Sequence, residues 1–149
     1  NIWAFFEERK EKHMQDFQED EKKNHDRIML VEDDTTITHV LKRQLERWGY
    51  EVFDTVDFEH VMEAFAGWKP DLVLMDIDMP KMDGIETAKR IMEMTDHMVP
   101  ILFVTALCDR QTVTLCRNLD AAGYIVRPYK PVFVKTEIKR ILMGRSEIE

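Results

Sequence analysis

Cysteine is scarce in this sequence, and its placement excludes several classes of protein. Cys108 and Cys116 are the only cysteines among 149 residues, and they lack the paired spacing of a zinc site or a disulfide framework. We therefore expect reduced thiols, as in a cytoplasmic protein. No apolar run approaches the roughly 18 residues that span a membrane, and the first residues lack the order of a signal peptide. The sequence predicts a soluble, cytoplasmic protein without a membrane span.

Basic residues are also in the minority. Lysine and arginine together number 21 against 29 aspartates and glutamates, so the formal net charge is −8. A protein that binds the phosphate backbone of nucleic acid needs a basic surface, and we therefore expect no direct nucleic-acid partner. Hydrophobic residues make up 44% of the chain, which is enough to form a core. The length favours one domain with an extension.

The first 26 residues differ in composition from the rest. A short aromatic cluster precedes an almost entirely polar stretch without Gly, Pro or Ser, a composition that is not typical of a flexible linker. Glu8 and Lys12 form one of two acid–base pairs at the i to i+4 spacing that stabilises a helix. We expect residues 1–26 to be a charged helical extension or linker. The pattern leaves open whether this helix dimerises, connects domains or is only solvated.

From Arg27 onward, apolar strands alternate with amphipathic helices. Short apolar runs without polar interruption are typical of strands that are buried on both faces, and helical spacing of apolar residues predicts a helix after each strand. The pattern predicts a flavodoxin-like doubly wound fold, (βα)5, with a five-stranded parallel sheet at residues 27–143 and a tail at 144–149. The expected strands are 28–31, 50–55, 72–75, 101–104 and 123–126, and the expected helices are 37–48, 58–65, 85–94, 109–118 and 134–142.

Polar residues directly follow three of these apolar runs. Glu32 and Asp33 follow the first run, Asp76 follows another, and Thr105 follows the run at 101–104. The carboxyl ends of parallel strands meet at one edge of the sheet, where ligands bind. We therefore expect these side chains to converge on one acidic pocket that binds a cation. A simpler alternative for the acids at 32–34 is a cluster that caps a helix N-terminus.

The ordered motifs resemble the receiver domain of two-component response regulators. The resemblance covers residues 27 to about 143 and implies a phosphorelay protein in which Asp76 accepts a phosphoryl group from a histidine kinase or phosphotransfer protein. It also implies Mg²⁺ bound by Glu32, Asp33, Asp76 and the backbone carbonyl of Asp78. The matching stretches are Met29–Asp34, Asp71–Gly84, Phe103–Ala106 and Ala122–Tyr129.

The resemblance also implies roles for three residues near the last strand. Thr105 matches the switch hydroxyl, Tyr124 the switch aromatic, and Arg127 the basic residue that contacts the phosphoryl group. The family usually has lysine before proline at this last position, and arginine brings a planar fork of donors instead of a compact ammonium. Lys130 is an alternative match, but it would place Arg127 in the middle of a strand.

The family signals by contact between proteins. The resemblance therefore implies that the chain is not an enzyme, although its aspartyl phosphate can hydrolyse itself. It leaves open whether the protein is a stand-alone regulator, a piece of a hybrid kinase or the receiver of a regulator with an output domain. It implies a homodimer through the face of the fourth helix, fifth strand and fifth helix, unless the N-terminal helix serves that purpose.

Two other functions fit parts of the pattern. One is a receiver-like interaction module that does not transfer phosphate, which the arginine at position 127 favours. The other is a haloacid dehalogenase-type phosphatase, whose Asp-x-Asp motif resembles Asp76 and Asp78. That motif continues with Thr or Val, whereas Met79 and Pro80 follow here, and the acidic pair precedes Asp76.

Overall fold

A computed structural model describes residues 26–80 and 82–148 of the chain. Within residues 58 and 145–148, only the backbone is described. The helix predicted for residues 1–26 therefore lies outside the described residues, apart from Asp26.

Five parallel strands form the central sheet of the described chain. They follow the order β2-β1-β3-β6-β7, which confirms the predicted doubly wound fold. The strands β1 and β3 are neighbours with Val31 opposite Met75, and β6 lies between β3 and β7. Their bounds are Arg27–Val31 for β1, Glu51–Thr55 for β2, Leu72–Met75 for β3, Ile101–Thr105 for β6 and Gly123–Val126 for β7.

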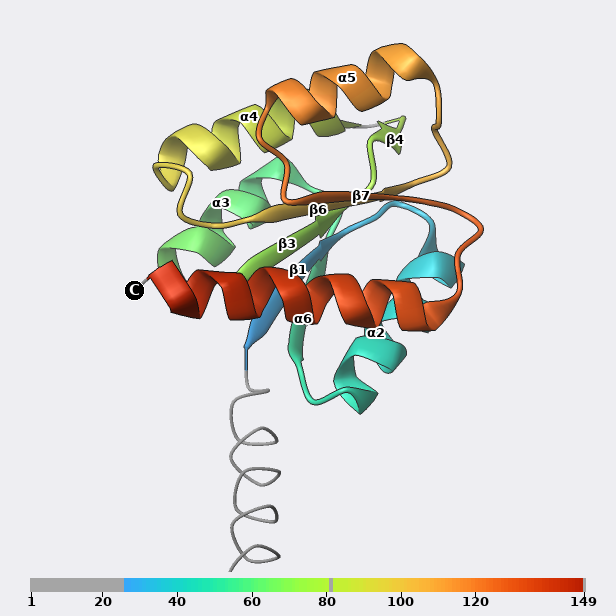
Figure 1. Ribbon diagram of the computed structural model, residues 1–149. Coiled ribbons are helices and arrows are strands. Elements are labelled where there is room, and N and C mark those ends of the chain that lie inside the picture. The colour runs from blue at the N-terminus through green and yellow to red at the C-terminus, as the bar shows by residue number, and fades with distance from the viewer. Residues whose placement is uncertain (1–25, 81, 149) are drawn as a thin grey trace, which may run out of the picture.

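Helices cover both faces of this sheet (Figure 1). Alternate residues of each strand point to opposite faces, so the core has two layers. One layer joins Leu30, Leu74 and Leu102 to α2 and α6, and the other joins Phe103 and Val73 to α3, α4 and α5. The helices are α2 (Thr35–Arg47), α3 (Phe58–Gly67), α4 (Gly84–Met94), α5 (Arg110–Asn118) and α6 (Pro131–Ile148).

Aspartate caps mark the helix starts that the sequence predicts. The Asp83 carboxylate accepts hydrogen bonds from the backbone N–H groups of Ile85 and Glu86 at the start of α4, and Asp109 caps α5 in the same way. Such a carboxylate satisfies N–H groups that have no partner inside the helix. Gly49 follows α2 with φ of 94°, a left-handed conformation that glycine adopts without steric cost.

A short antiparallel pair between β3 and α4 was not predicted. It consists of β4 (Asp78–Met79) and β5 (Met82–Asp83), with Asp78 opposite Asp83. Two-residue strands lack the periodic pattern that identifies longer ones. The pair lies directly after Asp76, beside the carboxyl edge of the sheet, and leads the chain into α4 (Figure 1).

Candidate functional site

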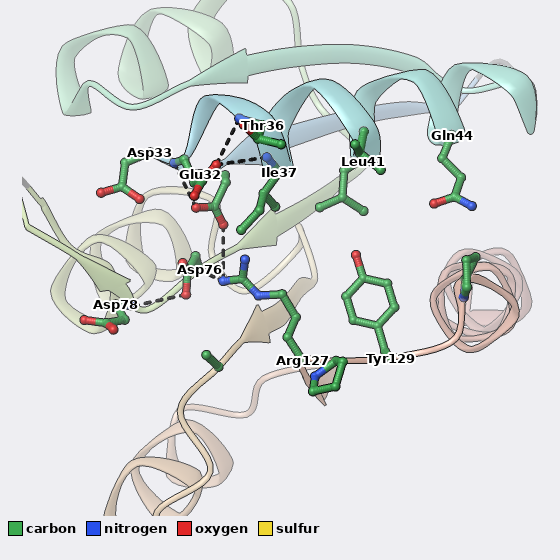
Figure 2. Close-up of a pocket in the computed structure, with 15 residues that line it drawn as sticks. Glu32, Asp33, Thr36, Ile37, Leu41, Gln44, Asp76, Asp78, Arg127 and Tyr129 are labelled. Carbon is green, nitrogen blue, oxygen red and sulfur yellow. Dashed lines mark hydrogen bonds and ion pairs between the residues drawn. The ribbon is translucent and has the colours of Figure 1, made fainter.

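Three carboxylates meet at the carboxyl edge of the sheet. Glu32 follows β1 and Asp76 follows β3, and because these strands are neighbours the two residues lie next to each other. One ligand atom from each of Glu32, Asp33 and Asp76 lies within 4.8 Å of the others. The convergence predicted for these acids is therefore present in the fold, as Figure 2 shows.

The Glu32 carboxylate is buried at this edge. Only 4% of the residue is exposed, and its Oε1 accepts a hydrogen bond from the backbone N–H of Asp34 at 3.1 Å. Burial raises the pKa of Glu32 to about 7, and the nearby charge of Asp76 also raises it, while the Asp34 N–H and Arg127 act in the opposite direction. A positive charge in the site therefore stabilises the ionised form of Glu32.

Asp76 is held from two sides. Its Oδ1 accepts a hydrogen bond from the backbone N–H of Asp78 at 3.2 Å, and its Oδ2 accepts one from Nη2 of Arg127 at 2.8 Å. The residue is 4% exposed, and its own N–H donates to the Val31 carbonyl. These contacts fix both the backbone and the carboxylate of Asp76, which pre-organises it for chemistry at its oxygens.

Arg127 comes from the opposite side of the sheet edge. It follows β7, and its backbone N–H donates to the Thr105 carbonyl at 2.8 Å, so the β6–β7 ladder carries it to the same edge as the acids. Its Nη2 also lies 3.5 Å from Oε2 of Glu32. Lys130, the alternative match, is exposed on the surface. The basic residue beside Asp76 in the structure is thus Arg127.

Thr105 and Tyr124 both bind the loop that follows β6. The Thr105 hydroxyl is fully buried and accepts a hydrogen bond from the Leu107 N–H at 3.3 Å. The Tyr124 hydroxyl donates to the Leu107 carbonyl at 2.6 Å, and burial raises the pKa of Tyr124 to about 12. Tyr124 therefore remains a donor at neutral pH, and one loop residue links the two side chains.

Asp78 differs from the buried acids. Its carboxylate is exposed, and it contacts Asp76 through its backbone N–H. Its position, two residues beyond Asp76, brings it to the rim of the site through the turn into β4. The structure leaves the carboxylate free to face solvent at the mouth of the site, as Figure 2 shows.

A hollow of about 740 Å³ opens beside these residues. Its acidic end contains Glu32, Asp33 and Asp76, and its other end has an apolar wall from α2 and from the segment after β7 (Figure 2). This wall was not predicted from the sequence, although the helical spacing of its α2 residues was a usable signal. The apolar wall consists of Ile37, Val40, Leu41, Tyr129 and Pro131.

The donor set fits a hard divalent cation. All three side chains of the cluster offer carboxylate oxygens, which are the ligands of Mg²⁺ and Ca²⁺, whereas zinc and copper sites in proteins favour histidine and cysteine. Asp33 is the partly exposed member, so a cation at this edge retains access to water. Asp76 also lines the hollow.

A doubly wound parallel sheet with three carboxylates and a basic residue at its carboxyl edge is the arrangement of CheY-like, flavodoxin-fold receiver proteins. Residues 28–139 match the response regulator receiver domain family. The chain belongs to this family.

Sequence relatives agree with this assignment. The sensory transduction protein BceR of Halalkalibacterium halodurans is 35% identical over 116 residues, which are 78% of this chain and 49% of BceR. The alkaline phosphatase synthesis transcriptional regulatory protein PhoP of Bacillus subtilis is 37% identical over 122 residues, which are 82% of this chain and 50% of PhoP. The chain thus spans about half the length of the curated relatives it matches.

Solved structures agree as well. A CheY-like receiver domain protein from Methanospirillum hungatei has a TM-score of 0.77 at 27% identity, covering 83% of this chain and 98% of that one. The BeF3-activated N-terminal receiver domain of Klebsiella pneumoniae RstA has a TM-score of 0.71 at 26% identity, covering 78% and 98%. The fold of this chain is therefore the receiver fold.

Two of the expectations concern membranes and nucleic acid. Among the described residues, no helix combines the length and the apolar character needed to cross a membrane. The expected absence of a nucleic-acid partner receives no support from the relatives, because PhoP is by name a transcriptional regulatory protein. That absence stays a prediction about this chain alone.

Proposed function

We propose that this receiver domain accepts a phosphoryl group on Asp76 and thereby switches an interaction surface. The observation that carries this proposal is the position of Asp76, which is buried at the sheet edge beside Glu32 and Asp33 and in contact with Arg127. A carboxylate in such a setting is a nucleophile with charge compensation already in place.

The transfer is a displacement at phosphorus. One carboxylate oxygen of Asp76 attacks the phosphorus of a phosphohistidine, an O–P bond forms, and the P–N bond breaks. The electron pair of that bond stays on the imidazole nitrogen, which takes a proton from water. The donor is a histidine kinase or a phosphotransfer protein, and the product is an aspartyl phosphate.

The carboxylates of Glu32, Asp33 and Asp76 would hold Mg²⁺, together with the backbone carbonyl of Asp78. Bound Mg²⁺ neutralises charge on the transferring phosphoryl oxygens. Arg127 supplies a second positive charge from the opposite side, where its Nη2 already contacts Asp76 at 2.8 Å. The buried backbone around Asp76 orients the carboxylate, so the donor's phosphoryl group meets a fixed acceptor.

Thr105 and Tyr124 would carry the signal outward. Thr105 would donate its hydroxyl proton to the phosphoryl group, and a movement of the hydroxyl toward that group would change its contact with the Leu107 N–H, from which it now accepts. Leu107 is also the residue whose carbonyl accepts from Tyr124. A change at one therefore shifts the population of conformations at the other. The surface that changes is the face of α5, β7 and α6. We propose that the homodimer forms through this same face or through residues 1–26.

We further propose that residues 27–143 are the receiver unit and that the protein works in the cytoplasm. The predicted tail at 144–149 is not separate from the last helix, because α6 continues to Ile148. In this proposal the domain is itself phosphorylated and does not catalyse a reaction on another molecule, so it is not an enzyme.

Intact mass after incubation with Mg²⁺ and acetyl phosphate tests the proposal. The wild type gains one phosphoryl group that hydroxylamine removes, the Asp76→Asn variant gains none, and the matched Asp78→Asn variant, which changes the exposed neighbour, still gains it. No adduct on a folded wild type, under conditions that label another receiver domain, would overturn the proposal. That outcome would favour a receiver-like module without phosphotransfer, whose Arg127–Asp76 ion pair is a permanent structural contact.

A further inference from the structure

Arg127 carries a buried donor without a partner. Its Nη2 contacts Oδ2 of Asp76 at 2.8 Å and lies 3.5 Å from Oε2 of Glu32. Its Nε–H is buried and has no hydrogen-bond acceptor, and among the described residues it is the one buried side-chain nitrogen or oxygen in this condition. Buried polar groups are nearly always hydrogen-bonded, so this exception needs an explanation.

The planar guanidinium determines where the missing acceptor belongs. Nε–H and Nη2 share one edge of the group and donate in parallel. Arg140 uses this edge on Glu137, with Nε donating to Oε1 at 3.3 Å and Nη2 donating to Oε2 at 2.8 Å. Arg127 presents the same edge at the functional site, but only its Nη2 position is filled.

The Asp76 carboxylate does not fill both positions. Its Oδ2 is used by Nη2 of Arg127, and its Oδ1 accepts from the Asp78 N–H. A group with two oxygens on one centre, carried by Asp76 itself, provides an acceptor for each donor of the edge. A phosphoryl group has this shape and charge, and arginine binds phosphate through two parallel hydrogen bonds.

We propose that Arg127 donates hydrogen bonds to the phosphoryl group on Asp76 from both Nε–H and Nη2. In the unphosphorylated site, the Nε–H donor therefore has no acceptor. This inference rests on the proposed function, and it assigns the arginine a role that lysine does not fill. A lysine ammonium is a compact point charge without a planar pair of donors. The arginine at this position therefore favours the phosphorylated state more strongly than the usual lysine does.

The bound-state mimic beryllofluoride, added with Mg²⁺, provides the test. In the wild type, proton–nitrogen NMR follows the Nε–H signals of Arg127 and Arg140 during the titration. We expect the Arg127 signal, assigned by its loss in Arg127→Lys, to move strongly as its donor gains an acceptor. The Arg140 signal should stay in place because its Nε–H is already used.

Fluorine NMR of bound beryllofluoride then compares affinities. We expect binding to be about tenfold weaker in Arg127→Lys, which is about 1.4 kcal/mol, and weaker still in Arg127→Gln. Lys130→Gln, which removes an exposed charge nearby, should bind like the wild type. Equal affinity of Arg127→Lys and wild type, or an unmoved Arg127 signal on a wild type that binds, would overturn the inference alone. A folded wild type that binds no beryllofluoride would overturn the proposed function together with it.

Discussion

Gly84 lies against the backbone that carries Asp76, and replacing it with alanine is a sharp test of how that backbone is supported. A β-carbon at Gly84 would lie 2.7 Å from the Asp76 carbonyl oxygen and 2.7 Å from the Ile77 α-carbon. Ordinary van der Waals contact begins near 3.4 Å, so the two segments must separate by about 0.7 Å. Both neighbours are main-chain atoms, and no side-chain rotation relieves the overlap.

The expected cost follows from this geometry. Forcing extra volume into a packed interior costs about 1–3 kcal/mol, and alanine recovers up to about 1 kcal/mol of helix propensity relative to glycine. With the full propensity gain subtracted, we therefore expect Gly84→Ala to lower the free energy of unfolding by up to about 2 kcal/mol in urea titrations. Phosphoryl incorporation from acetyl phosphate should also slow, because the shift moves Asp76 away from the Asp78 N–H and Arg127.

Gly144 in α6 is the matched control. A β-carbon there has no neighbour within 4 Å, so Gly144→Ala gains helix propensity without a clash and should stabilise the protein by about 0.5–1 kcal/mol. The two alanine variants must therefore differ in sign. If Gly84→Ala is as stable as Gly144→Ala and accepts phosphate at the wild-type rate, the proposed steric support of Asp76 is wrong.

Two further predictions concern the acids after β1. In metal-free protein the folded-state pKa of Glu32 is raised from 4.5 to about 7, so the folded state binds this proton more strongly than the unfolded state does. The protonated Glu32 carboxyl therefore contributes to stability below pH 4.5, and this contribution is lost as the pH rises to about 7. Urea titrations in EDTA should show that the free energy of unfolding of the wild type falls by up to ~3 kcal/mol across that pH window because of this group. Glu32→Gln should not show this fall. The same pH dependence of stability in both proteins would contradict the prediction. Asp34→Ala should lower stability by about 1 kcal/mol, because it removes the bonds to the N–H groups of Thr36 and Ile37, while Asp34→Asn should recover most of the loss; an unchanged urea midpoint in Asp34→Ala would refute the capping role.

Local signals explain why much of the fold was predictable. Apolar runs predicted β3 and β7 at the bounds that the structure has, and the helices expected at 85–94 and 109–118 begin within one residue of α4 and α5. These signals involve residues within a few positions of one another, so the sequence reveals them directly. The family resemblance added the order of the motifs around the sheet.

Other features depend on contacts that no local pattern encodes. Asp76 and Arg127 are 51 positions apart when they pair. Lys69 and His97 turn the chain with positive φ values of 55° and 57°, although glycine and asparagine are the residues that signal such turns. The β4–β5 pair was not predicted, because strands of two residues are too short to show a periodic sequence pattern.

The three consecutive acids after β1 show how one motif serves structure and function together. Glu32 is buried against Arg127, Asp33 is partly exposed in the carboxylate cluster at the sheet edge, and Asp34 caps α2. The capping alternative and the metal-site prediction therefore apply to different residues of one run. The Asp34 backbone N–H also donates to Glu32 at 3.1 Å, so the turn that starts the helix positions an acid of the site. A change of the Asp34 side chain should affect helix stability, whereas a change of Asp33 should affect the cation, since the two carboxylates have separate partners.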